Sequence, residues 1–161
     1  MRAYLFEHLA FVRTQTLNLV RNVPDDIAEM IPSGMNNHVK WNMGHVLFTL
    51  ERFAFGVNGE SMHLPEHYTE LFRTGSKPRE ISAEWPSMHE LVELLAVQVD
   101  RIEHRYAMHL HDTVLSPYTT SKGLKLTRVE EFLSFCLYHE GMHFDKMKSI
   151  LSQNNREFDI L

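Results

Sequence analysis

The stretch TRVEEFLSFCLYHEGMHFDKMKSI, residues 127–150, decides the fold of this chain. Its apolar and histidine side chains recur every three or four positions, which is the period of an α-helix with one buried face. The members of this stripe are Val129, Phe132, Cys136, His139, His143, Met147 and Ile150. Thr127, followed three residues later by Glu130, has the pattern of a capping box. We therefore predict a long helix that begins after Thr127 and buries two histidines.

The two histidines stand four residues apart, so a helix projects both imidazoles from the same face. The segment HEGMH, residues 139–143, also fits the H-E-x-x-H pattern of zinc proteases. Downstream of it the sequence offers a single glutamate, Glu157, and Lys146 stands where a metzincin has glycine. The protease interpretation is therefore rejected. Two possibilities remain: a hydrogen-bonded pair of core histidines, or two ligands of a metal ion that needs a third ligand from another helix.

Three other stretches have helical periodicity. The first ends before Pro24, which cannot continue a helix. The second follows a cap at Asn36 or Asn37 and ends in the region 56–59, and the third begins near 82–84 or at Ser87 and ends near Tyr106. The link 57–85 is long enough for a crossover, and the link 112–126 suits a short hairpin or a segment that wraps one end. We predict one all-α domain over residues 1–161, a four-helix bundle with a long crossover between helices 2 and 3.

The composition narrows the class of protein. Of the 161 residues, 43% are hydrophobic and 23% are charged, which is typical of a globular domain. The net charge of −5 and the scattered basic residues argue against nucleic-acid binding. No run of apolar residues is long enough to span a membrane, and the single cysteine, Cys136, fits a reducing compartment. We expect a cytoplasmic protein with no membrane and no nucleic-acid partner.

The segment WNMGH, residues 41–45, offers the missing third ligand. His45 lies in the inward row of its helix together with Trp41 and Phe48. Gly44 next to it costs about 1 kcal/mol relative to alanine inside a helix, which suggests that another backbone or a ligand needs the space. Asn42 is one possible partner for the second ring nitrogen of a ligating histidine.

Three segments together resemble the DinB-like superfamily of metal-binding four-helix bundles. They are NNHVKWNMGHVLFTLERF (36–53), LPEHYTELFRTGSKP (64–78) and HEGMH (139–143), and the resemblance covers nearly the whole chain in order and spacing. It implies an up-down-down-up bundle, often a homodimer, and a three-histidine metal site at His45, His139 and His143. Both zinc and nickel are usual in that family.

The resemblance also implies an activity. Characterised members include metal-dependent transferases that use low-molecular-weight thiols such as bacillithiol or mycothiol, so we expect a thiol cofactor and a small-molecule substrate. Thiol transfer predicts cationic groups for the cofactor, with Arg52 first and Lys40 and Arg128 as further choices. Hydrolysis of a small substrate predicts a carboxylate near the metal, either Glu140 or Glu51. We name Glu140 as the candidate catalytic residue, with an interhelix ion pair as its alternative role, and a non-catalytic, stress-related metal- or ligand-binding protein also stays open.

Overall fold

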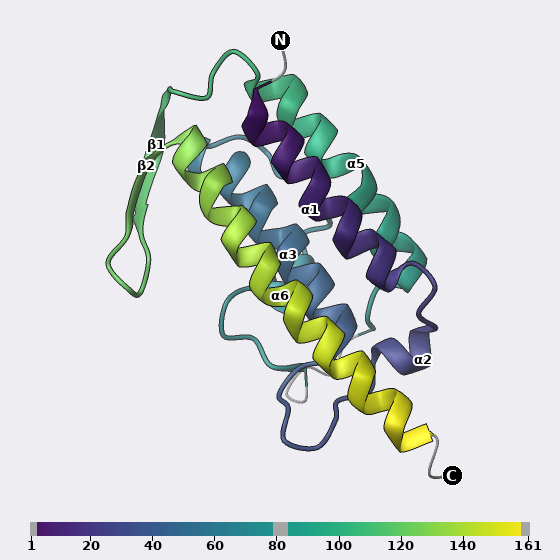
Figure 1. The fold of residues 1–161 in the computed structure, drawn as a ribbon. Coiled ribbons are helices and arrows are strands. Elements are labelled where there is room, and N and C mark those ends of the chain that lie inside the picture. The colour runs from purple at the N-terminus through teal and green to yellow at the C-terminus, as the bar shows by residue number, and fades with distance from the viewer. Residues whose placement is uncertain (1–2, 79–83, 159–161) are drawn as a thin grey trace.

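Four long helices form the body of the computed structural model, which describes residues 3–78 and 84–158, the last four without side chains (Figure 1). They are α1 (Tyr4–Val20), α3 (Val39–Ala54), α5 (Met88–Tyr106) and α6 (Val129–Phe158). Helices α1 and α3 each contact both α5 and α6. Short helices fill the links: α2 (Asp25–Ala28), η1 (Gly56–Asn58) and α4 (Tyr68–Phe72). The mostly helical fold confirms the helical class predicted from the sequence.

A small antiparallel sheet adds to the helical body. Strands β1 (Thr113–Thr119) and β2 (Lys125–Arg128) form the hairpin that was one of the two structures expected for the link 112–126. Its turn contains Gly123, whose φ of +88° lies in the left-handed region that glycine adopts without steric cost. The hairpin lies beside the beginning of α6 (Figure 1).

The cap of α3 differs from the sequence prediction. The cap residue is His38 rather than Asn36 or Asn37, because the Nδ1 atom of His38 accepts the Trp41 N–H at 3.0 Å. An imidazole nitrogen thus serves where a carboxamide or hydroxyl oxygen is usual. Burial of this ring lowers the pKa of His38 to about 4, so the accepting nitrogen stays unprotonated near neutral pH.

Helices α5 and α6 begin with standard capping chemistry. Helix α5 begins at the second of the two expected positions, where the Ser87 hydroxyl accepts the Glu90 N–H at 3.1 Å; residues 82 and 83 lie outside the described residues. At α6 the predicted capping box is displaced by one residue. Glu131, not Glu130, accepts the N–H groups of Thr127 and Arg128, at 2.6 and 3.0 Å. Glu131 is the third helical residue, the position from which a glutamate side chain can reach back to the cap.

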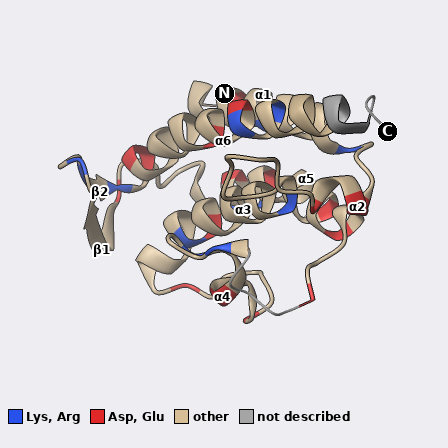
Figure 2. Ribbon diagram, turned by 90° about the horizontal axis from the view of Figure 1, so that it is seen from below, with Lys and Arg blue, Asp and Glu red and all other residues tan. Residues whose placement is uncertain are grey.

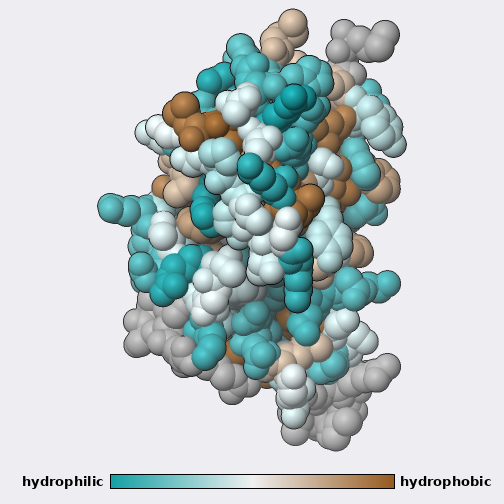
Figure 3. All heavy atoms as spheres, turned by 90° about the vertical axis from the view of Figure 1, so that its left-hand side faces the viewer, coloured by the Kyte–Doolittle hydropathy of each residue, from teal (hydrophilic) through white to brown (hydrophobic). Residues whose placement is uncertain are grey.

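Apolar side chains form two buried clusters, one toward each end of the bundle. One contains Phe53 and Phe132, and the other contains Phe72 and Met147. Charged residues of both signs lie on every long helix (Figure 2), and the face that carries the hairpin mixes hydrophilic side chains with separate apolar ones (Figure 3). Among the described helices, none combines the length and the apolar composition that crossing a bilayer requires.

Candidate metal centre

The three histidines expected at the site come together between α3 and α6. His45 projects from α3, and His139 and His143 project from neighbouring turns of α6. The Nε2 atoms of His45 and His139 are 3.1 Å apart, and one nitrogen from each of the three rings lies within 4.8 Å of the others. In the described part of the chain, no other group of three or more histidine, cysteine, aspartate or glutamate side chains is arranged to hold a metal ion.

Hydrogen bonds orient two of the three rings. The Nδ1 atom of His45 donates to the main-chain oxygen of Phe72 at 2.7 Å, and that of His143 donates to Oδ1 of Asn42 at 2.8 Å. The Asn42 amide is itself fixed, because its Nδ2 atom donates to the His38 carbonyl oxygen at 2.8 Å. A protonated and bonded Nδ1 leaves the lone pair on Nε2 free for a metal. The role expected for Asn42 therefore agrees with the structure.

Aromatic rings enclose the cluster. Trp41 stacks on His45 with 4.7 Å between ring centroids and 8° between planes, and Phe135 stacks on His139 at 6.2 Å and 30°. The indole N–H of Trp41 donates to the Ser76 hydroxyl at 2.9 Å, which fixes the position of this wall. His45 is only 5% exposed, whereas the two histidines of α6 remain partly accessible. The site is thus apolar around α3 and reachable along α6.

The surroundings keep all three imidazoles neutral. Burial lowers the pKa of His139 to about 3 and that of His143 to about 4, and the neighbouring histidines add repulsion between positive charges. Burial also lowers the pKa of His45, although its bond to the Phe72 carbonyl partly opposes this. Neutral imidazole is the form that binds a metal. The cluster is therefore ready for a metal at neutral pH without first losing a proton.

The donor set fits a divalent transition metal. Imidazole nitrogens suit zinc and nickel, and three histidines with an open fourth position are typical of catalytic zinc. Two nitrogens bound to tetrahedral zinc at 2.0–2.1 Å would be about 3.3 Å apart, close to the 3.1 Å between His45 and His139. The residues present can hold a metal ion.

The lowered pKa values predict how stability depends on pH in metal-free protein. Between about pH 6.5 and pH 4 the unfolded chain binds protons on His38, His139 and His143 that the folded chain excludes. The free energy of unfolding should therefore fall as the pH drops through this range, by about 1.4 kcal/mol per pH unit for each histidine. Urea denaturation with a chelator at pH 7.5, 6.0 and 5.0 measures this slope.

Two variants check the source of that slope. His139→Gln removes one partly buried imidazole and should make the slope shallower, whereas His104→Gln changes an exposed residue and should leave the slope unaltered. A free energy of unfolding that stays constant from pH 7.5 to pH 5.0 would contradict the assignment of buried, neutral histidines.

Gly44 keeps the partner of His45 in place. A Cβ atom at Gly44 would lie 2.1 Å from Cε1 of Phe72, whose ring is fully buried. The group that needs the space is thus the side chain of α4, rather than the backbone or ligand expected from the sequence. Because the carbonyl of this same Phe72 accepts the Nδ1 proton of His45, the missing side chain lets α4 dock against the histidine cluster.

We expect Gly44→Ala to destabilise the fold by about 1–3 kcal/mol, as overpacking usually does, and to weaken metal binding by displacing Phe72. Gly141→Ala is the matched control: this helical glycine of α6 has nothing within 4 Å of an added Cβ, so it should gain up to about 1 kcal/mol from helix propensity. Thermal unfolding and zinc titration of both variants test the pair. If both variants were stabilised equally, the Phe72 ring would have moved aside at no cost, which would contradict the prediction.

The two candidate carboxylates lie in buried ion pairs. Glu140 receives Nε of Arg13 at 2.9 Å and Nη2 at 3.1 Å, and both side chains are almost fully buried. Glu51, fully buried, receives both terminal nitrogens of Arg101, at 3.1 and 3.0 Å. The histidine group that could hold a metal ion contains neither carboxylate. Glu140 thus occupies the ion pair that was its alternative role, and its catalytic role stays a prediction.

The cationic candidates differ in their availability. Lys40 is held by Asp25 and Glu29. Arg52 lies over the rings of Phe53 and Tyr118, at 5.6 and 5.7 Å from their centroids. It lines a pocket of about 530 Å³ between α3 and the hairpin, on the same face of α3 as His45 but two turns further along. Among the described residues it has no carboxylate partner, so it remains available to an anion.

Sequence reasoning missed the network to which these carboxylates belong. Gln98 of α5 accepts from Arg13 at 3.1 Å and donates to Glu51 at 2.8 Å, so the chain of bonds joins all four long helices. A signal was present, because Arg13 follows Leu9 by four residues in the inward row of α1. An inward arginine predicts a buried acidic partner. The buried Cys136 lies nearby, where burial and the Glu140 carboxylate raise the pKa of its thiol.

Comparison with known proteins identifies the family to which the chain belongs. Its residues 8–147 match the DinB superfamily. A solved structure described as the conserved protein of locus from Enterococcus faecalis is similar in fold, with a TM-score of 0.60, 16% sequence identity, and coverage of 94% of this chain and 96% of that one. A search of curated proteins found no match. Because the family match spans most of the chain, this protein belongs to the DinB superfamily.

Proposed function

We propose that this protein is a metal-dependent enzyme that transfers a low-molecular-weight thiol to an electrophilic small molecule. The observation that carries the proposal is the convergence of three neutral imidazoles, two of them with Nδ1 already bonded, on one partly accessible point between α3 and α6. His45, His139 and His143 would hold zinc or nickel. Such an ion, when bound, stabilises a thiolate or hydroxide near neutral pH.

The carboxylates favour thiol transfer over hydrolysis. A hydrolase needs a base near the metal-bound water, and both acidic side chains expected for that task are held by arginines, Glu140 by Arg13 and Glu51 by Arg101. A thiol needs no such base once it is bound as thiolate. The chain's own contribution would then be to position the thiol and to exclude water with the rings of Trp41 and Phe135.

Arg52 supplies the second part of the proposal. Its guanidinium is exposed, has no carboxylate partner in the described chain, and lines a pocket on the His45 face of α3. A guanidinium matches the geometry of a carboxylate and can bind it through two hydrogen bonds. We therefore propose that Arg52 binds a carboxylate of the thiol cofactor while the thiol itself reaches the metal centre.

Cobalt-loaded protein offers a direct test. Addition of N-acetylcysteine should produce thiolate-to-cobalt absorption in the near ultraviolet, whereas N-acetylserine, which has an oxygen in place of the sulfur, should not. Arg52→Gln should raise the concentration of N-acetylcysteine needed for half saturation and leave cobalt binding unchanged. Cobalt that binds without any thiolate absorption would exclude thiol transfer, and ester hydrolysis by the same sample would then favour a hydrolase.

The non-catalytic alternative predicts a different result. A storage or sensing site binds its metal but changes the rate of neither reaction. Partial exposure of His139 and His143 favours the enzyme, because a substrate can approach from the α6 side. Zinc-loaded protein that neither binds thiols nor hydrolyses esters would support the binding protein instead.

Three expectations from the sequence stay predictions: the up-down-down-up topology, the homodimer and the cytoplasmic location. The topology is supported by the pairwise contacts of the four long helices and by the chain directions that can be followed in Figure 1. Analytical ultracentrifugation tests the dimer.

A further inference from the structure

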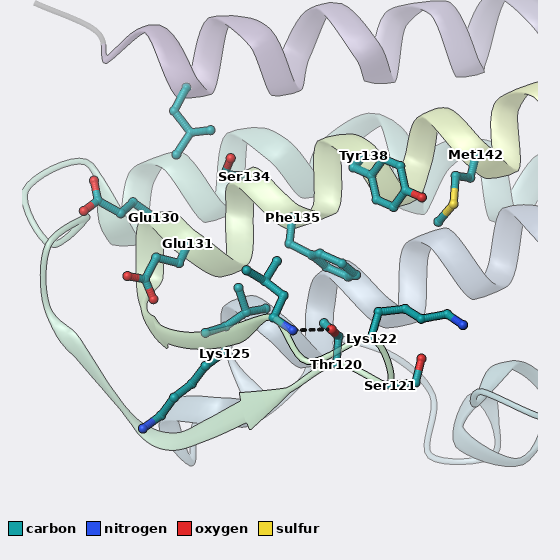
Figure 4. Close-up of a pocket in the computed structure, with 13 residues that line it drawn as sticks. Thr120, Ser121, Lys122, Lys125, Glu130, Glu131, Ser134, Phe135, Tyr138 and Met142 are labelled. Carbon is teal, nitrogen blue, oxygen red and sulfur yellow. Dashed lines mark hydrogen bonds between the residues drawn. The ribbon is translucent and has the colours of Figure 1, made fainter.

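A groove on the outer face of α6 carries features of a binding site. It has a volume of about 1060 Å³ and lies between α6 and the hairpin (Figure 4), and Leu5 of α1 also lines it. Three of its apolar side chains are markedly exposed: Leu124 at 54%, Tyr138 at 64% and Met142 at 44%. Exposed apolar side chains that gather in a concave site of this size are typical of a ligand pocket.

Two carboxylates and two ammonium groups line the groove, and they differ in whether they have partners. Glu130 is paired with His111 at 2.9 Å, and Glu131 accepts the N–H groups that begin α6. Lys122 and Lys125, by contrast, have no ion-pair partner among the described residues. Lys122 extends along the groove toward its Met142 end, whereas Lys125 points away from the groove (Figure 4). Both carboxylates thus accept hydrogen bonds within the chain, whereas the ammonium group of Lys122 is left to meet an anion.

We propose that this groove binds a small amphipathic anion, an organic carboxylate or sulfonate with an aromatic or aliphatic body. The body would lie against Phe135, Leu124 and Tyr138, and the anionic group would meet Lys122. An aromatic body suits this surface, because the rings of Phe135 and Tyr138 lie 6.2 Å apart and tilted at 57° to each other.

One wall of the groove contacts the candidate metal centre. Phe135, which lines the groove, stacks on His139, and Met142 precedes His143 in α6. A molecule that lies against Phe135 would therefore be separated from His139 by this one side chain. The inference that the molecule in the groove is the substrate of the metal centre rests on the proposed function. The inference that the groove binds an amphipathic anion is independent of that function.

Fluorescence titration with 8-anilinonaphthalene-1-sulfonate tests the groove, with the uncharged N-phenyl-1-naphthylamine as matched probe. Lys122→Gln should weaken binding of the sulfonate about threefold to fivefold, as expected for one exposed charge pair, and leave the uncharged probe unaffected. Lys125→Gln removes the same charge from the same hairpin and should change the affinity for neither probe. Leu124→Ser, at an exposed position, should weaken both probes at least about fivefold.

The titrations are made on chelator-treated and on zinc-loaded protein, so that the groove is tested apart from the metal. Sulfonate binding that persists without zinc and follows the pattern above supports the groove, whatever becomes of the proposed enzyme. Binding that needs zinc, or that is equally sensitive to Lys122→Gln and Lys125→Gln, would overturn it, as would an unchanged affinity in Leu124→Ser. Competition by the probe against thiol transfer would then identify the groove as the substrate site.

Discussion

His45→Ala and His143→Ala should each lower zinc affinity more than about 100-fold and leave the helical fold in place. Each removes one of three nitrogen donors that lie within 4.8 Å of one another. The expected loss exceeds the 10- to 100-fold that follows removal of a mere orienting partner. Metal content by elemental mass spectrometry, together with far-ultraviolet circular dichroism, separates lost binding from lost structure.

Two further variants serve as controls for the expected loss of zinc affinity. Asn42→Ala removes the oxygen that accepts from Nδ1 of His143 at 2.8 Å, so it should cost about 10- to 100-fold in zinc affinity. His104→Ala changes an exposed histidine of α5 and should cost nothing. Zinc retained in His45→Ala would show that α3 supplies no ligand. Zinc lost in His104→Ala would place the site elsewhere.

The three-histidine cluster could be predicted from the sequence because its signals are local. Spacing of four residues on α6 places His139 and His143 on one face, and the inward row of α3 contains His45. The family resemblance joined the two segments. The hydrogen bond from His45 to the carbonyl of Phe72 could not be predicted from the sequence. Helix α4 lies within a link without helical periodicity and is positioned only by tertiary contacts. Gly44 indicated that another group packs closely against α3, but the sequence did not identify that group as Phe72.

The role of Glu140 shows the opposite case. Its position next to His139 in the sequence suggested chemistry, but adjacent helical residues point about 100° apart. This rotation turns Glu140 away from the histidines and toward α1, where it meets Arg13. Only the packing of α1 against α6 decides between the two roles, and periodicity in either helix alone does not contain that information.

The Arg13–Glu140 pair belongs to a polar layer between the two apolar clusters. Along α1, Arg13 stands between Leu9 of one cluster and Val20 of the other, and along α5 Gln98 stands between Val99 and Leu95 in the same way. A buried pair of this kind gains little over an apolar replacement, but breaking it strands a charge in the interior. The layer is therefore sensitive to the loss of either partner.

Arg13→Met and Glu140→Gln should each lower the free energy of unfolding by about 3–5 kcal/mol, since each leaves the opposite charge buried without its partner. That is a large part of the 5–15 kcal/mol that holds a typical domain folded. Urea denaturation measures the change. Arg105→Met is the matched control: its bidentate pair with Glu60 is 45% and 30% exposed, so its loss should cost only about 0–1 kcal/mol.

The double variant Arg13→Met/Glu140→Met decides what Glu140 is for. If the carboxylate serves only to neutralise Arg13, removing both charges should restore at least half of the stability lost in Glu140→Gln. Thiol transfer should return with the fold, because the three histidines and their orienting bonds remain. A double variant that regains stability and zinc but stays inactive would show instead that the Glu140 carboxylate takes part in the reaction.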